Sequence, residues 1–368
     1  MNTVTTDHKA FFGATLMRKR LSQRTGAKTL LAAAVLGVLV AGSSLAAQPA
    51  RRAAQAAPAP AQPDFSAVQV RSMHVKGNIW VLQGAGGNVT AQIGDEGVLL
   101  VDTQFAPMAE KLIAEIRKLA GNRPLRFILN THAHEDHIGG NYAVGKYGSK
   151  VFGGNERNDN PEGMKGATMI AHENVQFNLL KAEGTPQETA KQNWPTEYYT
   201  GEKYEIYFNG EGIELLHQPT AHTDADTFVF FRGSDVVSAG DIWNSTGYPY
   251  IDVSRGGHIN GIIAGLNKLV DIAIPDLNEE GGTMIIPGHG RVGDESDVFD
   301  YRDMITIIRD RIQTMVAKGM TIEQVKAARP TLDYDGRYGS TTGFWTTDMF
   351  IETVYRQLKE AANGGGGR

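Results

Sequence analysis

The sequence has no cysteine among its 368 residues. This absence excludes disulfide bonds, a thiolate nucleophile and thiolate metal ligands. Positive charge is scarce beyond residue 63, because residues 64–368 contain 28 Lys and Arg against 40 Asp and Glu, a net charge of −12. Such a surface repels phosphate backbones, so we predict that nucleic acid is not a partner.

Only one apolar run is long, TLLAAAVLGVLVAG at 29–42. It follows a basic segment at 17–28 and precedes small residues at 43–50, which is the order of a secretory signal. The run falls short of the about 20 residues that a membrane-spanning helix needs. We therefore predict a signal peptide over residues 1–47, with an uncleaved membrane anchor as the alternative. The predicted location is periplasmic or secreted, with membrane contact only through this segment and no protein partner evident.

Residues 48–63 are rich in alanine and proline and are predicted to form a disordered linker. Beyond them, short apolar runs bounded by glycine alternate with segments of helical periodicity. Strands followed by a helix, twice over, favour one α/β domain over 64–362, with two sheets packed face to face and helices outside. The chain is predicted to be mostly helical from about residue 300 and to end in a flexible tail over 363–368. Strands are predicted at 78–84, 88–94, 97–102, 126–130, 212–219, 227–233, 235–241 and 283–290, and helices at 108–121, from about 136, at 258–274 and at 302–316.

The stretch THAHEDH follows the apolar strand at 126–130 directly. His132 and His134 are two residues apart, so an extended backbone points them the same way. Asp136 and His137 lie where a helix is predicted to begin, so their side chains should point in another direction. Two ligands in each direction would serve two neighbouring cations, whereas the alternative is a solvated, histidine-rich loop.

Three further potential ligands follow or end apolar runs elsewhere in the chain: His222 in PTAHTDADT, Asp241 in SAGDIW and His289 in IIPGHG. Each alone is compatible with a surface histidine or a turn residue. Together with the first cluster they predict a metal site, because side chains at the ends of different strands can converge.

The remaining candidates have weaker patterns. The segment WNSTGYPY at 243–250 either lines a substrate pocket or packs its own loop through Trp243 and Tyr248. The histidines without a matching partner are predicted to be structural or exposed, and they are His74, His172, His217 and His258.

Five motifs resemble those of the metallo-β-lactamase superfamily over most of residues 70–300: GVLLVDTQF, THAHEDHIGGN, PTAHTDADT, SAGDIW and IIPGHG, in the family's order. The resemblance implies an αββα sandwich of two mixed β-sheets flanked by helices, with a metal site at one edge of the sheets. It further implies one zinc on His132, His134 and His222, a second on Asp136, His137 and His289, a bridging Asp241, and Asp102 supporting the ligand loop.

Imidazole and carboxylate ligands suit zinc, so the predicted cofactors are two Zn²⁺, with iron or manganese as alternatives. The predicted function is a dinuclear zinc hydrolase that cleaves a carbonyl bond of a small-molecule ester, lactone or β-lactam by metal-bound hydroxide. Asp136 is the predicted catalytic residue, carrying a proton to the leaving atom. With no cysteine and no serine in a G-x-S-x-G elbow, an acyl-enzyme route has no evident nucleophile.

Three alternatives remain open. A β-lactamase proper is less favoured because such members of the superfamily tend to carry Cys or Ser at the position of Asp241. An iron oxygenase would use His132, His222 and Asp241 around one Fe(II), but it has no need of the second ligand set. A binding protein on a decayed enzyme fold would have no reason to keep seven ligands.

Overall fold

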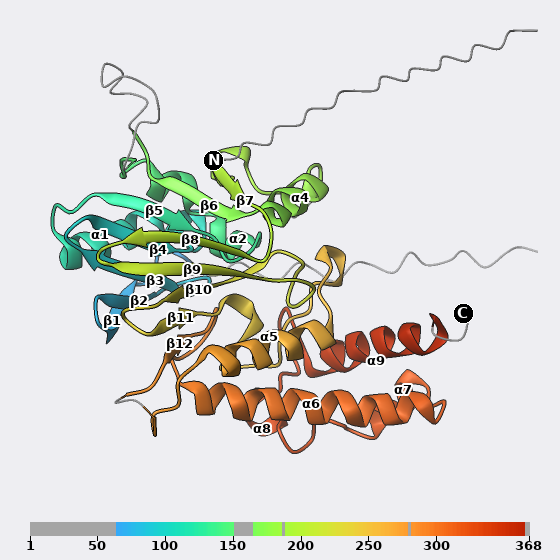
Figure 1. Cartoon of the computed structure of the whole chain (residues 1–368). Helices are drawn as coiled ribbons and strands as arrows, with labels where there is room; N and C mark the ends of the chain where they lie inside the picture. The colour runs from blue at the N-terminus through green and yellow to red at the C-terminus, as the bar shows by residue number, and fades with distance from the viewer. Residues whose placement is uncertain (1–63, 151–164, 186–187, 279–280, 365–368) are drawn as a thin grey trace, which may run out of the picture. The chain divides into compact units, whose positions relative to one another are not determined.

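The computed structural model describes residues 64–150, 165–185, 188–278 and 281–364. The predicted signal peptide at 1–47 and linker at 48–63 lie outside the described residues. Within these residues two β-sheets lie between layers of helices, which confirms the predicted αββα arrangement (Figure 1). Both sheets are mixed, as the resemblance implied.

The first sheet has seven strands in the order β1-β2-β3-β4-β5-β6-β7. Neighbours from β1 to β4 are antiparallel, and neighbours from β4 to β7 are parallel. The chain crosses from β4 to β5 through α1 (Ala109–Ala120), whose Leu112, Ile113 and Ile116 pack against this sheet. The strands are β1 (Arg71–Lys76), β2 (Ile79–Gln83), β3 (Val89–Gly94), β4 (Gly97–Val101), β5 (Leu125–Leu129), β6 (Thr168–His172) and β7 (Glu197–Tyr199).

The second sheet has five strands in the order β12-β11-β10-β9-β8. All neighbours are antiparallel except β11 and β12, which run parallel. The strands are β8 (Lys203–Phe208), β9 (Glu211–Gln218), β10 (Asp226–Phe231), β11 (Val236–Ser238) and β12 (Met284–Ile286).

The central strand β10 shows why the sandwich has three apolar layers. All six of its residues are buried, because both faces of the strand are covered. Val229 and Phe231 belong to the core between the two sheets, and Phe228 and Phe230 belong to the core under the helices. This alternation follows from the two-residue period of a strand.

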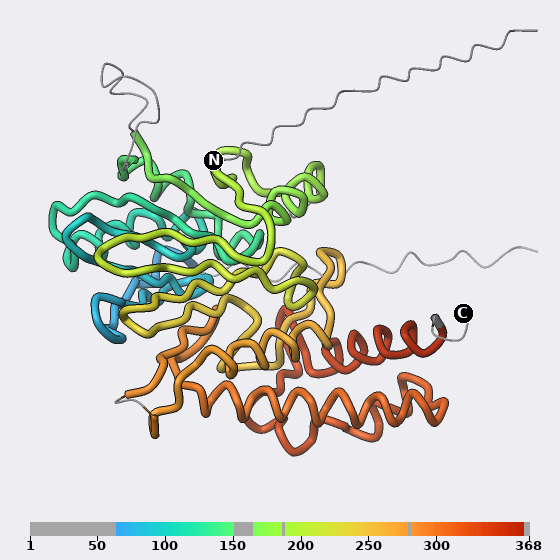
Figure 2. Tube along the Cα trace, viewed as in Figure 1, coloured from blue at the N-terminus to red at the C-terminus, as the bar shows by residue number. Residues whose placement is uncertain are grey.

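The helices α5, α6 and α9 cover the outer face of the second sheet, and their chain traces lie side by side (Figure 2). Among the described residues, no helix has the length and apolarity to span a membrane. The helices besides α1 are α2 (Glu135–Ile138), α3 (Asn141–Gly145), α4 (Glu173–Ala182), α5 (Ile259–Ile272), α6 (Glu295–Ala317), α7 (Ile322–Ala327), α8 (Asp335–Tyr338) and α9 (Thr347–Gly364), with short 3₁₀ helices η1 (Ala106–Met108), η2 (Lys191–Asn193), η3 (Gly240–Ile242) and η4 (Val253–Arg255).

The boundaries of the helical C-terminal part differ slightly from those predicted. The long helix α6 begins at Glu295 rather than near residue 300, because Asp294 accepts a hydrogen bond from the backbone N–H of Asp297 and so caps the helix. The last helix, α9, continues to Gly364, two residues beyond the predicted end of the domain at 362.

Candidate metal centre

The candidate ligands lie where strands of both sheets end. His132 and His134 lie in the loop after β5, and Asp136 and His137 belong to α2, which follows at once. From the second sheet, the ligands are His222 in the turn between β9 and β10, Asp241 in η3 after β11, and His289 after β12. The structure brings all seven predicted metal ligands together at one edge of the sandwich, in two groups.

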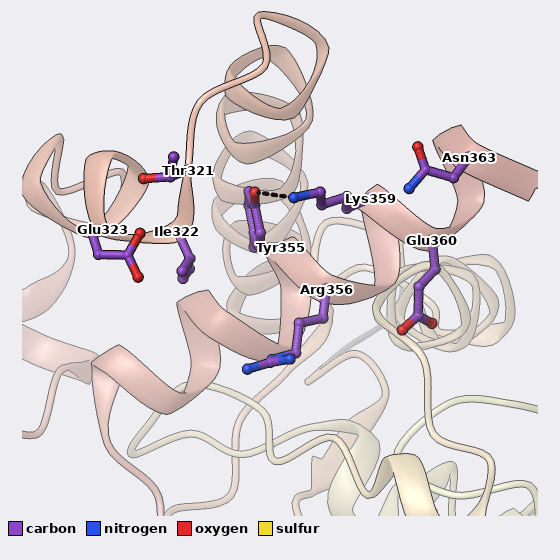
Figure 3. Close-up of a pocket in the computed structure, with 8 residues that line it drawn as sticks. All are labelled: Thr321, Ile322, Glu323, Tyr355, Arg356, Lys359, Glu360 and Asn363. Carbon is purple, nitrogen blue, oxygen red and sulfur yellow. Dashed lines mark hydrogen bonds between the residues drawn. The ribbon is translucent and has the colours of Figure 1, made fainter. Parts of the chain in front are cut away.

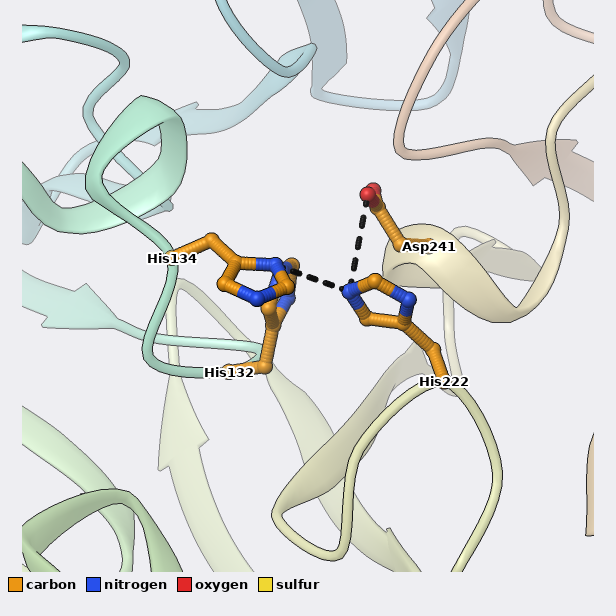
Figure 4. A group of neighbouring side chains, drawn as sticks. All are labelled: His132, His134, His222 and Asp241. Carbon is orange, nitrogen blue, oxygen red and sulfur yellow. Dashed lines mark hydrogen bonds and ion pairs between the residues drawn. The ribbon is translucent and has the colours of Figure 1, made fainter. Parts of the chain in front are cut away.

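The first group contains His132, His134, His222 and Asp241, with one ligand atom of each within 4.8 Å of the others (Figure 4). His134 Nδ1 lies 3.0 Å from His132 Nε2 and 2.9 Å from His222 Nε2. Asp241 Oδ2 lies 3.8 Å from His222 Nε2. Three imidazole nitrogens thus point at one small volume.

Hydrogen bonds behind these rings determine which nitrogen carries the proton. His222 Nδ1 donates to the Tyr250 carbonyl at 2.8 Å, and His134 Nε2 donates to Asp252 Oδ2 at 2.9 Å. Thr131 Oγ1 donates to Asp102 and therefore accepts from His132 Nδ1. The three nitrogens that converge are consequently those with free lone pairs, which is the arrangement that a metal cation requires.

The second group contains Asp136, His137 and His289. Asp136 Oδ2 lies 3.2 Å from His289 Nε2 and 3.7 Å from His137 Nε2. His137 Nδ1 donates to Asp102 Oδ2 at 2.8 Å, so its Nε2 presents a lone pair to this group. Asp102 thus supports the ligand loop from behind, as the resemblance implied, and it also accepts from the Thr131 N–H.

Asp241 connects the two groups. Its Oδ1 lies 3.1 Å from His137 Nε2, and its Oδ2 lies 3.4 Å from His289 Nε2 as well as near His222. Oδ1 is buried, yet it accepts no hydrogen bond from the described residues. A buried, ionised oxygen facing imidazole nitrogens is strongly unfavourable unless a proton or a metal cation lies between them. The residues present therefore fit metal ions at both groups.

Two of the histidines in the first group are held neutral. Burial lowers the pKa of His132 well below its usual range, and the neighbouring histidines add to this. Burial also lowers the pKa of His222 to about 4. Neutral imidazole is the form that coordinates a metal, so these residues need not lose a proton at neutral pH to bind one.

The second group is dominated by charge pairing. Burial opposes charge on His289, but Asp241 and Asp136 outweigh it and raise its pKa to about 10. Burial likewise opposes charge on Asp136, but His137 and His289 lower its pKa to about 2. The two carboxylates therefore stay ionised and require positive charge beside them, supplied by protons or by metal ions.

Asp252 and Arg255 are site residues that the sequence analysis missed. Asp252 accepts from His134 on one side and from Arg255 Nη1 at 2.9 Å on the other, and its backbone N–H donates to the His222 carbonyl. In addition, Gln357 of α9 binds the segment that follows, since its Nε2 donates to Gly257 O and its Oε1 accepts from Ile259 N. The C-terminal helix thus holds the loop that supports the first group.

A cavity of about 450 Å³ opens onto the two groups. Tyr248, from the segment predicted either to line a pocket or to pack, does both, because it lines the cavity and stacks on Phe350 with ring centroids 4.9 Å apart. Trp243 is buried in the core under the helices. The cavity is otherwise walled by residues far apart in the chain, Phe105, Tyr250, Phe344 and Trp345 among them.

A second cavity, of about 410 Å³, lies beside α7 and α9 (Figure 3). No histidine is among its lining residues, and Lys359 Nζ there donates to Tyr355 Oη. This cavity therefore offers nothing comparable to the ligand groups described above.

The other histidines are structural or exposed, as predicted. His172 and His258 each accept a hydrogen bond from a backbone N–H in the first turn of a helix, at α4 and α5. His217 stacks on His172 with centroids 3.6 Å apart, and His74 is exposed.

A family model described as the metallo-beta-lactamase superfamily matches residues 82–289. The matched span exceeds half of the chain and contains all seven candidate ligands and Asp102. The chain therefore belongs to the metallo-beta-lactamase superfamily, as its motifs indicated.

One curated relative is the 2,4-dinitroanisole O-demethylase subunit alpha of Nocardioides sp. (strain JS1661), which is 24% identical over 177 residues. The match covers 46% of this chain and 47% of the relative, so the chain spans about half of that protein's length.

Two solved structures match much of the chain. The inverting sec-alkylsulfatase Pisa1 from Pseudomonas sp. aligns with a TM-score of 0.57 and 12% identity, over 79% of this chain and 50% of its own. The DIM-1 metallo-beta-lactamase aligns with a TM-score of 0.48 and 20% identity, over 65% of this chain and 98% of its own. At these identities the likeness concerns the fold alone.

Proposed function

We propose that the protein is a dinuclear zinc hydrolase that cleaves a carbonyl bond of a small molecule. The observation that carries this proposal is the position of Asp241, whose Oδ2 lies between His222 of the first group and His289 of the second, while its Oδ1 faces His137 of the second. A mononuclear iron site built on His132, His222 and Asp241 would leave Asp136, His137 and His289 without a role. Membership of the superfamily supports a metal-dependent enzyme in general.

In this proposal one ion would be held by His132, His134 and His222, a second by Asp136, His137 and His289, and Asp241 would serve both. Cations bound there would supply an acidified water molecule and a polarised substrate carbonyl. Asp136 lines the cavity beside the second group, where its carboxylate can face both a bound water and the substrate. It can therefore accept a proton from the attacking water and pass it to the leaving atom.

The size of the cavity also supports the proposal. Its volume of about 450 Å³ lies in the range of pockets for small molecules, about 300–1,000 Å³. We infer that an ester, a lactone or a β-lactam enters from this side, and export from the cytoplasm, predicted from residues 1–47, would bring the enzyme to substrates that arrive from outside.

A second candidate is cleavage of an aryl ether at the same site. The name of the curated relative, an O-demethylase acting on 2,4-dinitroanisole, favours it. Ether and ester cleavage place different demands on the leaving group but share the need for an activated water and a proton carrier.

The test is a measurement of metal content together with a hydrolysis panel on the purified chain. We expect close to two zinc ions per chain and turnover of at least one of a β-lactam, a lactone, a phenyl ester and 2,4-dinitroanisole. Asp136→Ala should lower kcat by about 100-fold or more, the typical contribution of a positioned proton carrier. His172→Ala, which changes a histidine outside the metal centre, should leave kcat within a few-fold.

Specific results would overturn the proposal. One iron per chain with oxygen consumed during turnover would indicate the oxygenase, and a covalent adduct on the protein would exclude direct attack by water. Equal losses of activity in Asp136→Ala and His172→Ala would show that the site is misplaced.

A further inference from the structure

One wall of the cavity is aromatic. The Tyr250 ring meets Phe344 edge to face at 4.8 Å and Trp345 at 4.9 Å between centroids. Trp345 Nε1 donates to the Pro249 carbonyl at 3.1 Å, which fixes this contact. Phe344 is nevertheless 58% exposed. An apolar ring left open beside a cavity is suited to stacking on a flat apolar ligand.

Tyr250 places this aromatic wall next to the metal centre. Its ring centroid lies 5.8 Å from that of His134 and 5.5 Å from that of His222, both in the first ligand group. A ring packed against the wall would therefore lie beside the first ligand group.

Arg255 adds a positive charge to the same cavity. Its side chain is 10% exposed, and it lines the cavity together with Tyr250 and Phe344. Within the described residues its guanidinium makes one hydrogen bond, from Nη1 to Asp252. Its remaining N–H groups can therefore donate to a ligand in the cavity.

Asp252 neutralises the positive charge of Arg255 only in part. Asp252 also accepts from His134 at 2.9 Å, from Ser254 Oγ at 2.5 Å and from the Arg255 backbone N–H, so its negative charge is shared among four donors. Apart from the two ligand carboxylates, the acidic residue lining the cavity is Glu135, which is exposed at its rim. The buried charge available to a ligand away from the metal centre is thus positive.

We propose that the substrate is an aromatic molecule that carries a carboxylate apart from the bond to be cleaved. The aromatic ring lies against Tyr250, Phe344 and Trp345, and the carboxylate accepts hydrogen bonds from Arg255, whose planar fork of donors matches a carboxylate. This inference rests on the proposed function only in taking the cavity as the substrate pocket.

The experiment measures binding without turnover. Calorimetry on the purified, metal-loaded full chain compares 4-acetamidobenzoate with its neutral analogue 4-acetamidobenzamide. We expect the anion to bind at least about tenfold more tightly, as one charged hydrogen-bonded contact is worth about 1.4 kcal/mol or more. Arg255→Met should abolish the preference by weakening the anion alone, and Arg255→Lys should restore part of it.

Two further variants separate the parts of the proposal. Phe344→Ala should weaken both probes by a similar factor, because the ring contact is common to them. Arg232→Met, which removes an exposed arginine paired with Glu214, is the control for net charge and should change neither affinity. Metal content is measured for every variant, so that loss of the site is recognised.

The proposal would be overturned if Arg255→Met kept its full metal content and still bound the anion more tightly than the neutral probe. The metal ions would then bind the carboxylate, and Arg255 would bind only Asp252. Equal affinity of both probes in the unaltered chain would overturn it too. Both results are independent of the hydrolysis panel, so a failed proposal on the substrate does not imply a failed proposal on the reaction, or the reverse.

Discussion

Single hydrogen bonds to the outer ring nitrogens of the histidines determine which nitrogen can bind a metal. His134 has both ring nitrogens engaged, with Nδ1 toward the other ligands and Nε2 on Asp252. Without an acceptor behind it, the ring is free to carry its proton on Nδ1 and to turn. Asp252 therefore positions a ligand without itself reaching the metal.

We predict that Asp252→Ala lowers the affinity for a metal ion at the first ligand group by about 10- to 100-fold. This is the usual effect of removing a hydrogen-bond partner behind a ligand. Asp252→Asn, which keeps an acceptor oxygen, should lose less. The measurement is competition with a chelating dye under equilibrium conditions. Asp303→Ala, which removes an exposed carboxylate paired with Arg302, serves as the control. An unchanged affinity in Asp252→Ala would show that other contacts suffice to orient His134.

The ligands themselves could be predicted from sequence, and their supports only in part. His132 to His137 form one dense motif, and His222, Asp241 and His289 each end an apolar run, so strand ends alone bring them together. Asp252 and Arg255 lie in a loop of no particular pattern. What places them is the backbone hydrogen bond from Asp252 to His222 and the clamp by Gln357, which are contacts between distant segments.

Among the helices, α4 has a histidine as its N-terminal cap. His172 ends β6 and caps α4, since its Nδ1 accepts from the Asn174 N–H at 3.2 Å. A cap of this kind requires the neutral ring, because a protonated histidine has no acceptor. Burial and the adjoining His217 lower the pKa of His172 to about 4 from its usual 6.5.

The sign of the pH dependence follows from this lowered pKa. In the unfolded chain His172 gains its proton near pH 6.5, whereas in the folded chain it does so near pH 4. The stabilisation is therefore complete above pH 6.5 and is lost as the pH falls from about 6.5 to about 4. We predict that His172→Asn, which keeps a capping oxygen, reduces the drop in the free energy of unfolding between pH 7 and pH 5.

Urea unfolding at the two pH values measures this drop. His74→Asn, at an exposed position, is the matched control. His132 and His222 also have lowered pKa values, so the drop should shrink and not vanish. An identical drop in His172→Asn and in the unaltered chain would show that the cap does not depend on the neutral ring.

For helices and strands with a clear hydrophobic period, most ends were predicted to within two or three residues. The predicted helix at 108–121 is α1 (Ala109–Ala120), and the predicted strand at 97–102 is β4 (Gly97–Val101). The strands β1, β6, β7 and β8 were not predicted. The strand β7 has three residues, β1 and β8 present mainly exposed and half-buried positions, and the apolar run in the buried strand β6 is only three residues long. Pairing with a neighbouring strand, rather than their own pattern, makes them strands.

At the scale of the whole domain, the metal centre joins the two sheets. Four of the seven ligands follow β5 of the first sheet, and three follow strands of the second. The ions would therefore act as cross-links between layers that otherwise meet through apolar side chains such as Leu129 and Ile286.

We predict that removing the metal with a chelator lowers the melting temperature, measured by scanning calorimetry. Metal present at 100 times its dissociation constant contributes about 2.7 kcal/mol, which for a domain of this size corresponds to about 4 °C. Added zinc should restore the original value. In Asp241→Asn, which loses the bridging carboxylate, the chelator should have a smaller effect; a melting temperature insensitive to chelation in the unaltered chain would contradict the cross-linking role.

The clamp that Gln357 of α9 makes on Gly257 and Ile259 has a consequence for how the protein is made. A ribosome releases the chain from its N-terminal end, so all seven ligands emerge before Phe344, Trp345 and Gln357 do. A nascent chain thus carries all seven candidate ligands while the aromatic wall of its cavity is still missing and the loop with Asp252 is still unclamped. The order of synthesis presents the candidate ligands first and completes the wall of the cavity last.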